Sequence, residues 1–226
     1  MFKKMNEKRL KLIADLCGRG LIADIGFASH PNLFIKGKII GVDMKWESTP
    51  SNYWKTLIAS GEALPFYNVL DAICAGEVIE HIEAPITFLV DCNKALKMNG
   101  KLVLSTPNPY HPGEIIKNIV GNTENLYADE HFYMFSYRFL LKLLELTGFH
   151  VVRCYGNYCK LPGFSLRIPT KGLPTISSNI LYYSKKVRNV RSEDIAAEVH
   201  NRRRTFLENY KREKGKYPSW YGHKAE

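Results

Sequence analysis

The sequence of 226 residues lacks the features that mark several specialised classes of protein. Its five cysteines are odd in number and form no CxxC pair, which argues against a disulfide framework. No apolar run approaches the roughly 20 residues of a membrane helix, and charges interrupt the N-terminal stretch that a signal peptide would keep apolar. Internal repeats and low-complexity segments are also absent. We therefore expect a cytoplasmic domain with no transmembrane segment.

The composition is that of one globular domain, but its charge is unevenly distributed. With 45% hydrophobic and 24% charged residues, the chain is neither disordered nor too small to bury a core. The net charge of +10 arises at the two ends, residues 1–20 and 185–226, whereas residues 21–184 carry 14 basic and 14 acidic side chains. A neutral body argues against a fold built to follow a phosphate backbone, although basic ends leave docking on nucleic acid or acidic lipid open.

Short apolar runs alternate with helical patterns along the chain. Seven runs have the length of buried strands: 21–26, 38–43, 53–60, 69–76, 101–106, 150–155 and 176–186. This alternation predicts an α/β fold, a Rossmann-like doubly wound sheet that is mostly parallel and covered by helices on both faces. We expect one domain over residues 1–187, with an N-terminal helix within 1–20, and a basic helical extension over 188–226.

Helix signals punctuate these strands. An apolar stripe through Phe88 and Leu96 predicts a helix that begins at Glu77 and stops at Asn99-Gly100. A second helix is expected after Ser136, a plausible N-cap, with Gly148 as its stop. Between them, residues 106–131 are rich in Pro, Gly and Asn, with one short helix expected around Ile115, and loops of this length are usually functional or mobile.

The first two predicted strands end in residues suited to an adenosine-type cofactor. Ligands of such sheets bind at the carboxyl ends of the strands. Gly26 permits a tight turn there, and Pro31 predicts a helix start whose N–H groups would face the ligand. Asp43 ends the second strand, where a carboxylate can accept hydrogen bonds from both ribose hydroxyls. Because the chain lacks G-x-G-x-x-G, a dinucleotide is disfavoured.

The chain also contains four longer segments in a fixed order: GEALPF, LDAICAGEVIEHIEAP, LKMNGKLVLSTPNPY and DEHFYMFSYRFLLKLLELTGFHVV. Together they resemble the class I S-adenosylmethionine-dependent methyltransferases, and more narrowly the branch that contains the ubiquinone-pathway O-methyltransferases. The resemblance covers residues 10–184. It implies a seven-stranded sheet whose last strand is antiparallel, with the methyltransferase domain over 1–187.

The resemblance also implies which residues bind S-adenosylmethionine. Its methionine part would lie on the first glycine motif, its ribose on the acid after the second strand, and its adenine on the residues beside that acid and before the fourth strand. The matching positions are Asp24, Gly26, Ala28, Asp43, Met44, Ser60, Gly61, Glu62 and Gly76. The chain departs from the family where the second and third glycines of G-x-G-x-G are missing, with Ala28 at one of these places.

The segment EVIEH carries the candidate chemistry. In a helix, Glu77, Glu80 and His81 would share one face, being spaced i, i+3 and i+4, and His131 could reach them from the long loop. Two carboxylates and two imidazoles suit Mg²⁺, Mn²⁺ or Zn²⁺, and the quartet resembles that of metal-dependent small-RNA 2′-O-methyltransferases. Alternatively His81 or His131 acts as a metal-free general base, or the acids only favour a helix N-terminus. His111 is expected to be an exposed loop residue.

The acceptor pocket is expected to come from the long loop, residues 106–131, and its neighbours. Aromatic residues cluster there and suit a planar ring or a sugar face, although Phe135 is better read as core: Tyr110, Tyr127, Phe132, Tyr133 and Phe135. Arg138 and Arg167 would meet an anionic substrate, but we expect surface positions for both.

Three functions follow from these features. The first is methyl transfer to an oxygen of a small molecule, saccharide or lipid-linked intermediate. The second is a metal-dependent RNA 2′-O-methyltransferase that uses the basic ends, with Arg202–Arg204 near Tyr210, Tyr217, Trp220 and Tyr221. The neutral body disfavours it. The third is a binding module that has lost its cofactor, which the missing glycines suggest.

Overall fold

The computed structural model describes residues 2–120, 131–160, 167–170, 172–216 and 218 of the chain. The chain forms two compact units, Met1–Asn189 and Val190–Glu226. Among the described residues, none of the helices combines the length and the apolar character that crossing a membrane requires.

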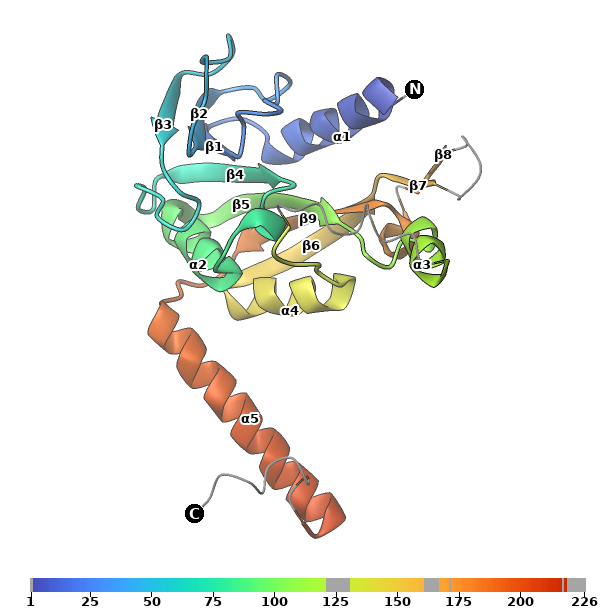
Figure 1. Cartoon of the computed structure of the whole chain (residues 1–226). Helices are drawn as coiled ribbons and strands as arrows, with labels where there is room; N and C mark the ends of the chain where they lie inside the picture. Colours follow the sequence, from blue (N-terminus) through green and yellow to red (C-terminus); the bar gives the residue numbers. More distant parts are fainter. Residues whose placement is uncertain (1, 121–130, 161–166, 171, 217, 219–226) are drawn as a thin grey trace. The chain divides into compact units, whose positions relative to one another are not determined.

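A seven-stranded sheet forms the centre of the first unit (Figure 1). Its strands, in spatial order, are β3 (Lys55–Ile58), β2 (Lys38–Asp43), β1 (Leu21–Ile25), β4 (Leu70–Gly76), β5 (Leu96–Pro107), β9 (Asn179–Lys186) and β6 (Phe149–Gly156). Neighbouring strands from β3 to β5 are parallel, whereas β9 is antiparallel to both β5 and β6. The predicted fold, including the antiparallel last strand, is confirmed. A small second sheet pairs β7 (Tyr158–Lys160) with β8 (Arg167–Pro169).

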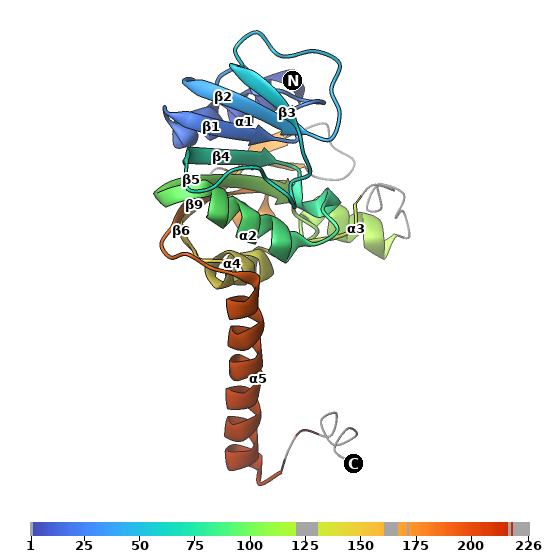
Figure 2. The ribbon, with the colours of Figure 1, turned by 90° about the vertical axis from the view of Figure 1, so that its left-hand side faces the viewer.

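Helices cover both faces of this sheet (Figure 2). They are α1 (Phe2–Cys17) on one face and α2 (Pro85–Ala95) and α4 (Tyr137–Leu146) on the other. Helix α3 (Pro112–Ile119) lies beside β7 instead, and two short 3₁₀ turns, η1 (Ile79–His81) and η2 (Pro174–Ile176), are also present. Successive strand residues point to opposite faces, so Ile73 packs in the core beneath α2 and α4, and the adjacent Cys74 packs in the core beneath α1. The nearly continuous burial of β1, β2 and β4 therefore follows from a sheet that is covered on both faces.

The helix expected at Pro31 is absent, and the chain crosses from β1 to β2 in turns. Asn32 explains the turn: its side chain accepts a hydrogen bond from the Phe34 N–H at 3.1 Å and donates one to the Leu10 carbonyl at 2.9 Å. Gly37 then has φ +121° immediately before β2. Because these polar groups are bound outside a helix, the segment remains in turns.

The single helix expected from Glu77 to Asn99 is also wrong. Glu77 has φ +59°, outside the right-handed helical region, and only the three-residue turn η1 follows it. The main helix α2 starts afresh at Pro85, because the residue before a proline disfavours helical geometry. It ends at Ala95, so Leu96 begins β5 instead of completing a helical stripe.

Two downstream helices agree with the sequence. Ser136 caps α4, since its hydroxyl accepts a hydrogen bond from the Phe139 N–H at 3.2 Å. Gly148 follows that helix with φ +85°, as expected for its stop. The short helix expected around Ile115 is α3.

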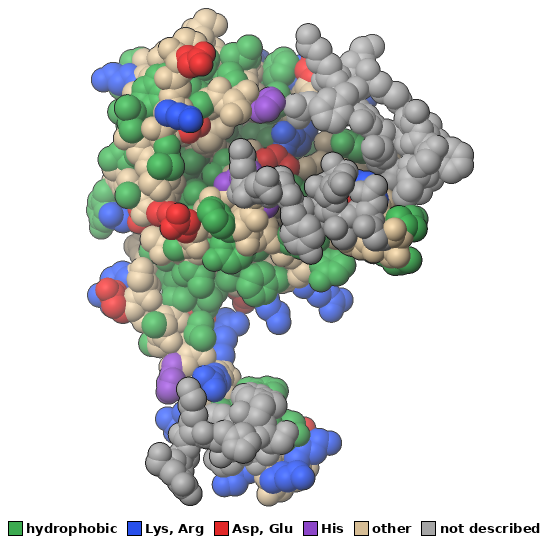
Figure 3. Space-filling model, in the orientation of Figure 1, with side chains coloured by type: hydrophobic (Ala, Val, Ile, Leu, Met, Phe, Trp, Pro, Cys, Tyr) green, Lys and Arg blue, Asp and Glu red, His purple; other side chains and the backbone are tan. Residues whose placement is uncertain are grey.

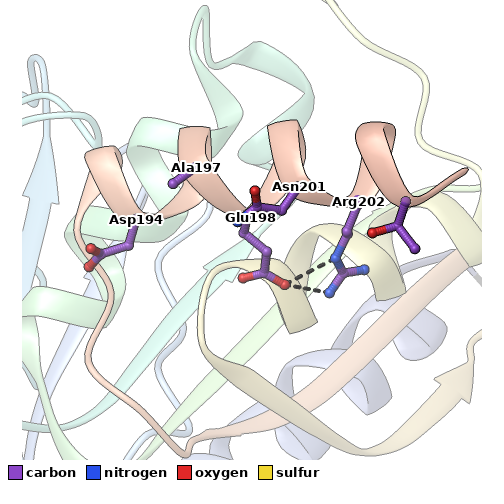
Figure 4. Close-up of a pocket in the computed structure, with 6 residues that line it drawn as sticks. Asp194, Ala197, Glu198, Asn201 and Arg202 are labelled. Atoms are coloured by element: carbon purple, nitrogen blue, oxygen red, sulfur yellow. Dashed lines mark hydrogen bonds and ion pairs between the residues drawn. The ribbon is translucent and has the colours of Figure 1, made fainter. Parts of the chain in front are cut away.

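The second unit contains helix α5 (Ser192–Lys214). Two of its arginines form ion pairs with glutamates one helical turn away. Arg202 pairs with Glu198 at 2.5 Å (Figure 4), and Arg204 pairs with Glu208 at 3.0 Å. A hollow along this helix is lined by Asp194, Ala197, Glu198, Asn201, Arg202 and Thr205, all of them on α5. The expected partners Tyr217, Trp220 and Tyr221 lie outside the described residues.

Candidate active site

A cleft of about 840 Å³ opens at the carboxyl ends of β1, β2 and β4. Eight of the nine residues expected to bind the cofactor line it: Asp24, Gly26, Asp43, Met44, Ser60, Gly61, Glu62 and Gly76. Figure 3 shows acidic, basic and histidine side chains gathered near the end of β4. The structure therefore brings together residues that lie 52 positions apart in the sequence, and the cleft is where the topology predicts a ligand site.

The loop after β1 requires a glycine. Gly26 has φ +75°, and a Cβ atom at this position would lie 2.5 Å from Cγ2 of Val78. Its N–H donates to the Val42 carbonyl at 2.9 Å, which ties the loop to β2. The close approach of Val78 places this loop directly beside the segment that follows β4. The second and third family glycines are absent, but the first is needed for both its backbone conformation and its lack of a side chain.

Asp43 faces the cleft from the end of β2. Its carboxylate accepts hydrogen bonds from the Ala28 N–H at 2.9 Å and from the Met44 N–H at 2.7 Å. An ionised carboxylate has about four acceptor positions, so both oxygens keep capacity for ligand hydroxyls. Ala28 does not line the cleft itself, and its contribution is the N–H that orients Asp43. Met44 is 73% exposed beside it.

Asp24 lies at the floor of the cleft and is held by protein groups. It accepts hydrogen bonds from the Tyr53 hydroxyl, the Cys74 thiol at 2.9 Å and the Asn32 N–H at 3.3 Å. Burial raises the pKa of Asp24 and, together with the charge of Asp24, that of Tyr53. These hydrogen bonds hold the loop after β1 against the floor of the cleft. No sequence signal pointed to Tyr53, which reaches Asp24 only through the packing of the loop before β3.

The residues of the turn after β3, Ser60, Gly61 and Glu62, have different roles. Glu62 accepts a hydrogen bond from the Ala84 N–H at 2.5 Å, so its carboxylate holds the start of α2. The Ser60 hydroxyl accepts from the Glu62 N–H at 3.2 Å and closes the turn. A Cβ at Gly61 would lie 3.0 Å from the Phe88 ring, which explains the small residue. The Glu62 carboxylate is therefore already bound to the protein backbone.

Glu77 is held apart from the other candidate metal ligands. Its carboxylate binds Arg9 at 2.9 Å, the Ser105 hydroxyl at 2.7 Å and the Asn179 amide at 2.5 Å. The sequence patterns had indicated no functional role for Arg9 or Asn179. Asn179 begins the antiparallel strand β9, so its position at the carboxyl edge of the other strands follows from topology, whereas nothing in the sequence signals that Arg9 reaches this edge.

Glu80, His81 and His131 form a second group. Each offers a ligand atom within 4.8 Å of the others, and the two imidazole rings meet edge to face at 4.5 Å. Glu80 is 1% exposed, and neither of its carboxylate oxygens has a hydrogen-bond partner among the described residues. Burial, reinforced by the charge of Glu77, raises the pKa of Glu80 to about 8. Three of the four expected ligands therefore converge, without Glu77.

The described part of the long loop does not form the expected aromatic pocket. Phe135 is buried in the core, as expected, and the Tyr133 hydroxyl donates to the Glu83 carbonyl at 2.9 Å. Tyr110 and Phe132 are exposed and, like these two, do not line the cleft. Tyr127 lies outside the described residues. The polar residues Asn157, Tyr158 and Asn179 line the cleft instead.

Three further expectations concern single residues. His111 is buried and not exposed, because its ring accepts a hydrogen bond from the Gly113 N–H at 3.2 Å and caps α3. Arg138 is exposed, as expected. The side chain of Arg167 is not among the described ones.

Comparisons with known proteins agree with this geometry. A family model described as a methyltransferase domain matches residues 17–153, more than half of the chain. No curated protein matches the sequence.

Solved structures extend the comparison. A methyltransferase from Thermotoga maritima, described as a possible histamine N-methyltransferase, has a TM-score of 0.63 at 19% identity, covering 81% of this chain and 90% of that one. A methyltransferase from Archaeoglobus fulgidus has a TM-score of 0.57 at 16% identity, covering 81% and 94%. Geranyl diphosphate C-methyltransferase from Streptomyces coelicolor was solved with Mg²⁺, geranyl diphosphate and S-adenosylhomocysteine. It has a TM-score of 0.57 at 13% identity, covering 82% of this chain and 80% of that one. At these identities the likeness shows the fold.

Proposed function

Since the chain belongs to the class I S-adenosylmethionine-dependent methyltransferases, we propose that it methylates a hydroxyl oxygen of a small molecule, a saccharide or a lipid-linked intermediate. The ubiquinone-pathway O-methyltransferase-like branch is part of this proposal. The observation that carries it is the cleft at the carboxyl edge, where the cofactor residues and His81 line one space. Its walls are polar on the acceptor side, at Asn157 and Tyr158, which suits a hydroxylated acceptor.

The cofactor fits this cleft on the structure's own evidence. The loop at Gly26 has no side chain and lets a ligand approach the backbone closely. Asp43 keeps acceptor capacity for two ribose hydroxyls, and the exposed Met44 offers an apolar surface for adenine. S-adenosylmethionine, when bound, supplies a methyl group on a positively charged sulfur. The task of these residues is to hold it so that the acceptor oxygen lies in line with the methyl carbon.

We assign His81 as the general base. When bound, S-adenosylmethionine would supply the methyl group, and its sulfur would keep the electron pair of the carbon–sulfur bond, so the acceptor oxygen would need only to lose its proton. The hydroxyl proton passes to an imidazole nitrogen of His81. The ring of His131, edge-on at 4.5 Å, limits the orientations that His81 can take. His81 lines the cleft and His131 does not, so His131 is a positioning residue in this scheme.

A second candidate mechanism uses a divalent cation at Glu80, His81 and His131. The observation that favours it is the buried carboxylate of Glu80, whose two oxygens have no partner among the described residues although two imidazoles lie within 4.8 Å. Two imidazoles with one carboxylate suit Zn²⁺ or Mn²⁺ better than Mg²⁺. A bound cation would lower the pKa of an acceptor hydroxyl. RNA methylation would need the same group, but the ion pairs of Arg202 and Arg204 reduce the basic character of α5.

The cofactor assignment is tested by titrating S-adenosylhomocysteine into the protein in a calorimeter. We expect one site per chain, and Asp43→Ala should weaken binding by about 100-fold or more, since two hydrogen bonds to a charged group are lost. Asp15→Ala, an exposed change on α1, is the matched control. If the folded wild-type protein gives no heat at several temperatures, the binding-module function replaces the enzyme.

The choice between the two mechanisms is tested by metal analysis. Protein stripped with a chelator and reloaded with Zn²⁺ or Mn²⁺ should hold one ion per chain if the cation mechanism holds, and Glu80→Gln should lose it. Glu77→Gln is the matched control, because Glu77 lies outside the group and should leave the ion in place. No retained ion in the wild-type protein would favour His81 as a metal-free base. Salt-dependent RNA binding that disappears without residues 188–226 would favour the RNA function.

A further inference from the structure

Arg9 and Glu77 form an ion pair inside the cleft, on the side of the Gly26 loop. Their side chains are only 13% and 25% exposed, and the Arg9 Nη1 atom lies 2.9 Å from Glu77 Oε1. Both residues line the cleft, and the same Nη1 atom donates to the Ser105 hydroxyl at 3.0 Å. Val78, which touches the position of a Gly26 side chain, directly follows Glu77. The pair therefore sits beside the loop on which the methionine part of the cofactor is expected.

The backbone of Glu77 has a positive φ, a conformation that is strained for glutamate. Among the described residues, the non-glycine residues with positive φ are Asn68, Asn99 and Glu77. Asparagine adopts this conformation readily, whereas glutamate does so at a cost of about 1 kcal/mol. Strain of this kind persists where the surrounding structure fixes a side chain for a task. At Glu77 the result is a carboxylate that points from the end of β4 into the cleft.

The pair is also more than an anchor for α1. That helix is held without it, because Ile13 and Cys17 are buried in the core and the Asn32 amide donates to the Leu10 carbonyl at 2.9 Å. Withdrawing an ion pair from water is a poor source of stability. The arrangement is better explained by a ligand that carries both charges.

We propose that Arg9 binds the carboxylate and Glu77 binds the ammonium group of the methionine end of S-adenosylmethionine, an inference that rests on the proposed function. An amino acid places its two opposite charges on one carbon, so it matches a neighbouring cation and anion. A guanidinium has five N–H donors and a carboxylate about four acceptor positions, so both groups can serve the ligand while they remain paired. Arg9 and Glu77 thereby select the complete cofactor over nucleosides that lack the amino acid.

Two ligands that differ in this end provide the test. S-adenosylhomocysteine carries the amino acid, and 5′-methylthioadenosine shares its adenosine and sulfur but ends in a methyl group. Arg9→Gln and Glu77→Gln should each weaken the binding of S-adenosylhomocysteine by about 10- to 100-fold, as expected for a lost charge-assisted hydrogen bond. Both variants should bind 5′-methylthioadenosine within about 3-fold of wild type, well below one lost hydrogen bond. Arg9→Lys, which keeps the charge, should recover part of the loss.

The outcomes separate this inference from the proposed function. Lys11→Gln on the same helix, an exposed residue paired with Glu7, should bind both ligands as wild type does. Equal losses for the two ligands would overturn the inference, because the pair would then shape the cleft as a whole, and so would no loss for either. Binding of 5′-methylthioadenosine also reports that a variant is folded. If the wild-type protein binds neither ligand, the proposed cofactor itself is wrong.

Discussion

The two sides of the cleft differ in how their residues are positioned. On the cofactor side, Gly26 and Asp43 directly follow or end short parallel strands, and the sheet topology places them at one edge. On the acceptor side, His131 reaches the cleft region from a connection between strands, held by two hydrogen bonds from Phe132 and Tyr133 to the Glu80 carbonyl. Regular structure therefore determines the first side, whereas the second depends on tertiary contacts that no local pattern encodes.

The largest effect that sharpens this comparison is expected at Phe135, a core residue that follows His131 by four positions. Phe135 is 2% exposed and packs against the rings of Tyr133 and Phe139. Phe135→Ala should lower the free energy of unfolding by about 3–5 kcal/mol, because a large buried ring is removed. Urea denaturation measures this loss, and affinity for S-adenosylhomocysteine should stay unchanged in conditions where the variant is folded. Phe132→Ala, at a position 62% exposed, is the control and should cost less than about 1 kcal/mol. A small loss of unfolding free energy in Phe135→Ala would instead indicate that Phe135 lines a pocket.

Much of the fold and of the cofactor side could be predicted for a physical reason. Short continuous apolar runs mark the strands, and the residue at the end of a parallel strand is fixed once the strand is known, as at Asp43. The capping hydroxyl of Ser136 is equally local, because its partner is three residues away. These features depend on neighbours in sequence, so the sequence contains their cause.

The error at Glu77 has the opposite cause. A helical reading of EVIEH assumed right-handed geometry at Glu77, but Arg9, Ser105 and Asn179 hold its carboxylate at the end of β4. These partners come from distant elements, so the separation of Glu77 from Glu80 could not be seen in a local pattern. The break before Pro85 was visible, since the residue before a proline leaves the helical region.

A smaller effect is expected at Gly26, on the cofactor side. Gly26→Ala introduces a Cβ atom 2.5 Å from Val78 Cγ2 at φ +75°. The strain and the clash should lower the free energy of unfolding by about 1–3 kcal/mol and weaken S-adenosylhomocysteine binding in calorimetry, because the loop must shift. Adding Val78→Ala removes the clash but not the backbone strain, so part of the affinity should return. If the single variant binds as tightly as wild type, close approach at this loop is not needed.

The smallest effect is expected at the opposite end of β4, where Asp71 provides a contrast with Glu77. Its carboxylate binds the Lys97 ammonium at 2.7 Å and the Leu21 N–H at 2.8 Å, and these bonds, that to Lys97 first, lower the pKa of Asp71. Since the folded-state pKa lies below the unfolded value, the stabilisation is present above about pH 4 and is lost as the pH falls further. The side chain is 37% exposed, so Asp71→Asn should cost less than about 1 kcal/mol at pH 7. Denaturation at pH 7 and near pH 3 should show this difference shrinking, with cofactor affinity unchanged. A loss of affinity as large as that of Glu77→Gln would mean that charge anywhere on β4 supports binding, and that the carboxyl edge is not special.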